Sequence, residues 1–270
     1  MKKTNLQSVA DNLNILGDFL SKRDIEDLSK ATLIKKYGIK QVDLLILLGG
    51  SIVYGCEIAG KAFNDGIAKQ LMIVGGEGHT TSLLRKAISE RYTSIITQNR
   101  MEADIILDLL YEKYSISKNN IFVEKESTNC GENATFSLKL ARDKGISPKT
   151  VIIMQDSSMQ LRMDATYKRE WRECNTIFIG YASYKAHVII KDGELAFEDN
   201  NICGMWSMEH YITLLLGEIP RLHDTPKGYG PNGKNYIVHV DIPTGVLEAF
   251  ENLKIHYAKY VRKPWQGENK

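Results

Sequence analysis

Two glycine-rich turns, each directly after a short apolar run, constrain the fold most strongly. Gly49-Gly50-Ser51 follows the run 44–48, and Gly75-Gly76-Glu77-Gly78 follows the run 71–74. Continuous apolar runs of this length are typical of strands buried on both faces of a parallel sheet. A strand, a glycine turn and a helix start together present backbone N–H groups to an anion. Two such turns at one sheet edge predict a nucleotide-like ligand.

Strand and helix patterns alternate from residue 43 to about residue 181. We expect strands at 44–48, 71–74, 121–123, 151–154 and 177–179. We expect helices at 53–65, 82–90, 100–114, 133–144 and 159–172. This alternation predicts an α/β protein whose parallel sheet has helices on both faces.

The pattern changes after residue 181, where we place a boundary between residues 1–182 and a smaller lobe of residues 183–270. Asp192-Gly193 predicts a two-residue hairpin turn. A largely apolar helix at 205–216 should be ended by Pro220, a strand is expected at 236–243, and a final helix carries an apolar stripe.

Composition excludes several classes of protein. The 270 residues have a net charge of +2, which argues against a dedicated nucleic-acid surface. Residues 1–20 read as an amphipathic helix and not as a signal peptide, and no run approaches the roughly 20 apolar residues of a membrane helix. We expect a cytoplasmic protein with free thiols, because the cysteines are scattered: Cys56, Cys130, Cys174 and Cys203. The sequence does not indicate the oligomeric state.

The two glycine turns differ in the chemistry they carry. Neither matches a dinucleotide fingerprint or a phosphate-binding lysine loop. The first turn either binds a ligand or is simply a tight turn between a strand and a helix. In the second, Glu77 can accept the hydroxyl groups of a ribose and His79 can contact a phosphate, a carboxylate or a base. The alternative is a solvent loop capped by Thr81 or Ser82.

Polar residues crowd the segment after the third expected strand. Asn129 and Glu132 have the spacing of a helix N-cap and its third residue, so local capping explains both. Capping does not explain the whole group, which predicts a polar pocket wall: Ser127, Thr128, Asn129, Glu132 and Asn133.

A fourth polar group follows the expected strand 151–154. It contains Gln155 and Asp156, with Arg162 in the next helix. Asp156 and Arg162 pair with each other or with solvent, or they orient an anionic ligand group.

The second lobe contributes further polar residues. Arg221 and Tyr229 belong to a cluster that can close over the sheet edge. His239 and Asp241 share one face of the expected strand, but no third metal ligand accompanies them, so we expect no metal.

In their order along the chain, six motifs resemble the YdcF-like branch of the domain-of-unknown-function-218 family. They are LLGGS, VGGEGH, STNCGENATFS, MQDSSMQLR, LLGEIPRLHD and GYGPNGKNYIVHVDIP, and the resemblance extends over residues 43–243. It implies a Rossmann-like three-layer α/β/α fold with a smaller C-terminal α+β lobe, an interlobe cleft and binding of S-adenosylmethionine. Envelope-anchored members of the wider family carry a histidine where this chain has Met159. We therefore expect neither their histidine-based mechanism nor their location.

Together these observations predict a small-molecule site across the sheet edge, between the turns at Gly49, Gly75 and residues 127–133. The leading expectation is a protein that binds S-adenosylmethionine or a nucleotide and acts as a transferase. One alternative is an enzyme acting on phosphorylated or lipid-linked envelope precursors. Another is a non-catalytic ligand-sensing module, which the absence of an obvious nucleophile and base favours over the envelope enzyme.

Overall fold

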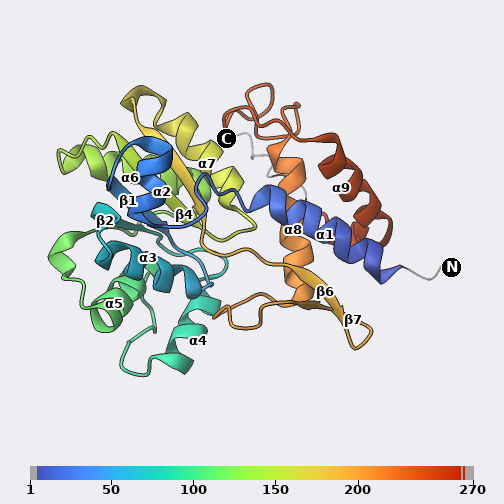
Figure 1. Cartoon of the computed structure of the whole chain (residues 1–270), viewed down its shortest axis with the longest axis horizontal. Coiled ribbons are helices and arrows are strands. Elements are labelled where there is room, and N and C mark those ends of the chain that lie inside the picture. Colours follow the sequence, from blue (N-terminus) through green and yellow to red (C-terminus); the bar gives the residue numbers. More distant parts are fainter. Residues whose placement is uncertain (1–4, 263, 265–270) are drawn as a thin grey trace.

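The computed structural model describes residues 5–262 and residue 264, and its centre is a parallel sheet (Figure 1). The sheet has 5 strands in the order β3-β2-β1-β4-β5. Their bounds are β1 (Val42–Leu48), β2 (Ala68–Val74), β3 (Ile121–Glu124), β4 (Thr150–Gln155) and β5 (Ile177–Ala182). After β3 the chain crosses to the other side of β1, so the strand order reverses between β1 and β4. In open α/β sheets, ligands bind beside the carboxyl ends of the strands at such a point.

Helices cover both faces of the sheet, which confirms the predicted α/β class and its three layers. The core helices are α2 (Lys30–Tyr37), α3 (Tyr54–Asn64), α4 (Thr81–Arg91), α5 (Glu102–Tyr114), α6 (Cys130–Asp143) and α7 (Gln160–Glu170). Alternate residues of β1 enter two separate cores: Leu45 packs with α3 and α5, whereas Ile46 packs with α6 and α7. Residues i and i+2 of a strand face the same side, so a strand covered on both faces must be apolar throughout.

The smaller lobe is built around three helices, α1 (Leu6–Leu20), α8 (Met208–Leu222) and α9 (Thr244–Tyr257). The predicted hairpin is present as β6 (Val188–Lys191) and β7 (Glu194–Phe197), and its turn residues Asp192 and Gly193 both have positive φ. Figure 1 shows α1 lying beside α8 and α9. The expected boundary had grouped α1 with the core, but its apolar stripe is buried in the smaller lobe. Short 3₁₀ helices lie at Lys118–Asn120, Arg172–Cys174 and Ala258–Tyr260.

Two local predictions are wrong. Pro220 does not end α8, which continues to Leu222, because Ile219 and Leu222 are fully buried in the lobe core. Residues 236–243 form no strand. The backbone N–H groups of Ile237 and Val238 donate to the carbonyls of Tyr229 and Ala165, and not to a neighbouring strand.

Candidate functional site

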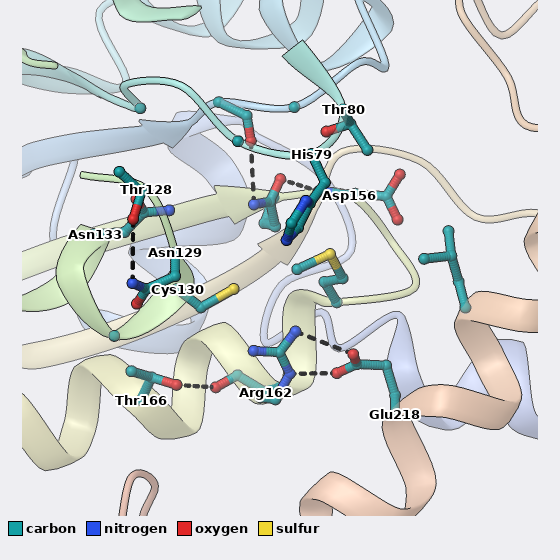
Figure 2. Close-up of a pocket in the computed structure, with 18 of the residues that line it drawn as sticks. His79, Thr80, Thr128, Asn129, Cys130, Asn133, Asp156, Arg162, Thr166 and Glu218 are labelled. Carbon is teal, nitrogen blue, oxygen red and sulfur yellow. Dashed lines mark hydrogen bonds and ion pairs between the residues drawn. The ribbon is translucent and has the colours of Figure 1, made fainter. Parts of the chain in front are cut away.

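A cleft of about 1030 Å³ lies between the carboxyl edge of the sheet and the smaller lobe. Its floor is formed by the ends of β1, β2 and β4, and one wall comes from α8. The strand order reverses at this edge, between β1 and β4. Figure 2 shows the polar side chains that point into it. Of the predicted site residues, these line the cleft: Gly49, Gly50, Ser51, Gly75, Gly76, Gly78, His79, Ser127, Thr128, Asn129, Asn133, Gln155, Asp156, Arg162, Arg221 and Tyr229.

The first glycine turn presents open hydrogen-bond donors to the cleft. Among the described residues, the backbone N–H groups of Gly50 and Ser51 have no partner. The Ser51 hydroxyl is also buried without one. The turn is tied to β4, because Gln155 Nε2 donates to the Gly49 carbonyl at 3.3 Å. Buried polar groups are rarely unpaired, so these donors indicate a ligand-binding surface.

The second turn keeps its glycines in the cleft but directs its carboxylate outward. Gly76 packs against the segment after β3 and donates its N–H to the Ser127 carbonyl at 2.9 Å. Glu77 is 53% exposed, forms an ion pair with Arg85 at 2.9 Å and does not line the cleft. The ribose-binding role expected for Glu77 therefore has no geometric support. His79 is exposed and lines the cleft (Figure 2).

A different carboxylate, that of Glu102, occupies the floor between the two turns. Glu102 is the first residue of α5, is 6% exposed and lines the cleft. Its backbone N–H donates to the Gly76 carbonyl at 3.0 Å, which attaches the start of α5 to the second turn. Glu102 was not among the predicted site residues, because nothing local in the sequence marks it.

The polar segment after β3 contains residues that cap α6 and groups that face the cleft. Asn129 caps α6, as predicted, by accepting from the Glu132 N–H at 3.0 Å. Glu132 returns the contact by accepting from the Thr128 N–H at 2.7 Å, and it does not line the cleft. Burial alone would raise the pKa of Glu132, but its contacts with Thr128 and Asn129 outweigh this effect and lower the pKa. Local capping therefore accounts for Glu132.

The remaining groups at the start of α6 face the cleft. Among the described residues, the N–H groups of Cys130 and Gly131 and the amide of Asn133 have no hydrogen-bond partner. The N-terminus of α6 therefore offers the cleft both N–H donors and the positive end of a 14-residue helix.

Asp156 does not pair with Arg162, although both line the cleft (Figure 2). The Asp156 carboxylate accepts from the Tyr184 hydroxyl at 2.8 Å, from Trp206 Nε1 at 2.9 Å and from the Ser158 N–H at 2.8 Å. All these donors are neutral, and they fix the cleft wall to the end of β4. The Asp156 carboxylate therefore already has hydrogen-bond donors within the protein.

Arg162 pairs with Glu218 of α8, a residue that the sequence analysis did not single out. The two contacts are Nε to Oε2 at 2.5 Å and Nη2 to Oε1 at 3.0 Å, and both side chains are buried. A bidentate pair neutralises the guanidinium but leaves its remaining edge facing the Cys130 thiol (Figure 2).

Aromatic side chains from the smaller lobe line another part of the cleft. Trp206 stacks on His210 with ring centroids 4.4 Å apart and an interplanar angle of 24°. Burial lowers the pKa of His210, and the positive charge of Arg262 lowers it further, while Asp156 opposes the shift. Arg221, Tyr229 and Tyr236 also line the cleft. Neither Trp206 nor His210 belonged to the predicted site, because both reach it from the loop before α8 and from its first turn.

No group of side chains in the described part of the chain is arranged to hold a metal ion. His239 contacts Asp224 at 2.8 Å and Asp241 at 3.1 Å, so both ring nitrogens have carboxylate partners. Within residues 5–262, no helix is long and apolar enough to span a bilayer.

No protein-family model matches this chain.

Proposed function

We propose that the cleft binds S-adenosylmethionine or a related nucleotide and that the protein is a transferase acting on a second small molecule. The observation that carries this proposal is the convergence of unpaired backbone N–H groups from three places. They come from Gly50 and Ser51, from His79 and Thr80, and from Cys130 and Gly131. Such donors suit the carboxylate of a methionine moiety or the phosphate of a nucleotide.

The aromatic residues of the cleft support a flat, apolar moiety in the same ligand. The rings of Trp206, His210, Tyr229 and Tyr236 lie along the cleft. Ligand sites of about 300–1,000 Å³ bury most of a drug-sized molecule. At about 1030 Å³, this cleft is large enough for a nucleoside ligand and a second substrate together. The resemblance to the YdcF-like branch supports S-adenosylmethionine as the first ligand to test.

The test is calorimetric titration with S-adenosylmethionine, S-adenosylhomocysteine and ATP, together with melting curves. A ligand at a hundred times its Kd stabilises the fold by about 2.7 kcal/mol. Absence of both heat and a melting shift with all of these ligands would reject the proposal.

A matched pair of variants at Cys130 locates the anionic group. Proline is favoured at the first helical position, and Asn129 before it is extended, so Cys130→Pro removes the N–H without breaking α6. Cys130→Ala removes the thiol but keeps the N–H. We expect only the proline variant to lose affinity, by about 1.5–3 kcal/mol for a bond to a charged group. Equal affinities would place the anionic group elsewhere.

The same donors also favour a second candidate, an enzyme acting on a phosphorylated or lipid-linked envelope precursor. Backbone N–H groups at a helix start bind phosphate as readily as carboxylate. Binding of ATP and inorganic phosphate, without binding of S-adenosylmethionine, would favour this candidate. Binding without turnover of any second substrate would favour a ligand sensor.

A further inference from the structure

Glu102 is held so that one of its carboxylate oxygens is fixed and the other is free. Oε1 accepts from the Thr81 hydroxyl at 2.7 Å, and Thr81 in turn accepts from the Gly78 N–H at 2.8 Å. Oε2 has no hydrogen-bond partner among the described residues. The side chain is 6% exposed and lines the cleft, so this oxygen is oriented but still accessible to a ligand.

The glycines at the ends of β1 and β2 make room for this oxygen. A Cβ at position 49 would lie 2.3 Å from Glu102 Oε2, and a Cβ at position 75 would lie 3.2 Å from it. The two turns therefore pack around the carboxylate of a residue that lines the cleft. This gives the glycine turns a role that anion binding alone does not require.

We propose that Glu102 Oε2 is the general base of this cleft and takes a proton from a hydroxyl, amine or thiol group of the second substrate. The inference rests on the proposed function, with a sulfonium methyl donor as co-reactant. The substrate heteroatom forms a bond to the methyl carbon, the carbon–sulfur bond breaks, and its electron pair returns to sulfur. The proton leaves the heteroatom and forms an O–H bond with Oε2, so the donor loses its positive charge and Glu102 its negative charge.

The surroundings of Glu102 fit this role. The pKa of Glu102 is raised, chiefly because the side chain is buried. The Thr81 hydroxyl and the charge of Arg85 oppose this shift, and the charge of Glu77 adds to it. The charged or titratable groups around it are Arg85 on α4, Glu77 on the second turn and Cys56 on α3. Arg85 is itself bonded to Glu77 and to the Arg100 carbonyl, and so makes no ion pair with Glu102. A carboxylate with a raised pKa is a better proton acceptor at neutral pH than an ordinary one.

The test measures the protonation of Glu102 directly, by carboxyl ¹³C NMR of protein labelled at glutamate. The resonance is assigned by its absence in Glu102→Gln. If that variant does not fold, Thr81→Val assigns it by removing the hydroxyl on Oε1. We expect a titration midpoint above the ordinary value of about 4.3. Saturating S-adenosylmethionine should lower this midpoint, because its sulfonium favours the carboxylate, and S-adenosylhomocysteine should lower it less.

Calorimetry adds a second readout. Affinity for S-adenosylmethionine should rise with pH by up to about tenfold per unit between the midpoints of the bound and free protein. This slope should be lost in Glu102→Gln and kept in Asp104→Asn, which neutralises an acidic residue on the same helical turn that does not line the cleft.

Three outcomes separate this inference from the proposed function. A midpoint at or below the ordinary glutamate value overturns the inference, whether or not a ligand binds. A raised midpoint that does not move when S-adenosylmethionine binds overturns it as well, because Oε2 would then not face the ligand. A raised midpoint without binding of S-adenosylmethionine, S-adenosylhomocysteine or ATP rejects the proposed function and overturns the inference with it, because no sulfonium donor is then bound.

Discussion

Arg162 of α7 and Glu218 of α8 form a buried, bidentate ion pair across the boundary between the two lobes. Both residues line the cleft, so the pair positions the α8 wall relative to the sheet edge. Replacing a buried pair by apolar residues is often neutral, but removing one partner leaves an uncompensated charge. Both residues are therefore needed to hold the two lobes in this relative position.

The first prediction concerns this pair. Glu218→Ala should lower the free energy of unfolding by about 3–5 kcal/mol, because Arg162 remains buried without its counter-ion. Urea denaturation followed by circular dichroism measures the loss. The double variant Arg162→Met, Glu218→Leu is the control and should recover most of the stability. A loss of about 1 kcal/mol or less, as surface pairs give, would mean that the pair is solvated.

The second prediction concerns the glycines of the second turn. A Cβ at position 76 would lie 2.4 Å from the Ser127 carbonyl oxygen and 2.6 Å from that of Lys125. Both are backbone atoms, so Gly76→Ala should destabilise the protein by about 1–3 kcal/mol, as overpacking does. Gly78→Ala is the matched control, because its nearest neighbour, the Thr128 carbonyl oxygen, is at 3.8 Å. Equal melting temperatures for the two variants would contradict the prediction.

The sheet and the edge of it that borders the cleft were predictable because their signals are local. Apolar runs specify buried strands, and the glycine turns that follow them mark the carboxyl ends. Asn129 was predicted as a cap from its spacing to Glu132 alone, and its contact with the Glu132 N–H confirms this.

The partners of the charged cleft residues were not predictable, because they come from distant parts of the chain. Asp156 is near Arg162 in sequence but bonds to Tyr184 and Trp206. Likewise, Glu77 was predicted to supply the carboxylate of the site, because it lies on the second glycine turn. Solvent and Arg85 stabilise the Glu77 side chain outside the cleft. The carboxylate in the cleft belongs to Glu102, which begins α5, the second helix after β2.

The third prediction concerns the pH dependence of stability near His239. Its contacts, first with Asp224 and then with Asp241, raise the pKa of His239 above its ordinary value of about 6.5. A group whose pKa is raised by folding stabilises the fold fully below its unfolded pKa, and this contribution is lost as pH rises through the folded pKa. His239→Gln should therefore lower the melting temperature at about pH 5.5 and have little effect at about pH 9.

Asp224 provides the control for that experiment. The Asn232 N–H and then His239 lower the pKa of Asp224, so its contribution is lost only as pH falls through this lowered value. Asp224→Asn should consequently reproduce the loss seen in His239→Gln at about pH 5.5, and combining the two substitutions should add little. The same melting difference at every pH would show that the imidazole charge plays no part.

The last prediction separates the two asparagines at the start of α6. Asn129→Ala removes the N-cap and should cost about 1 kcal/mol of stability while ligand affinity is unchanged. Asn133 lies beyond the cap, lines the cleft, and its amide has no partner among residues 5–262. Asn133→Ala should therefore leave the melting temperature unchanged and weaken S-adenosylmethionine binding by about 1 kcal/mol, since the amide can both donate to and accept from a ligand. Melting curves and calorimetric titration of both variants give the comparison. If Asn133→Ala binds as the unsubstituted protein does, the polar side chains after β3 serve α6 alone, and any ligand contact from this segment must come from the backbone N–H groups of Cys130 and Gly131.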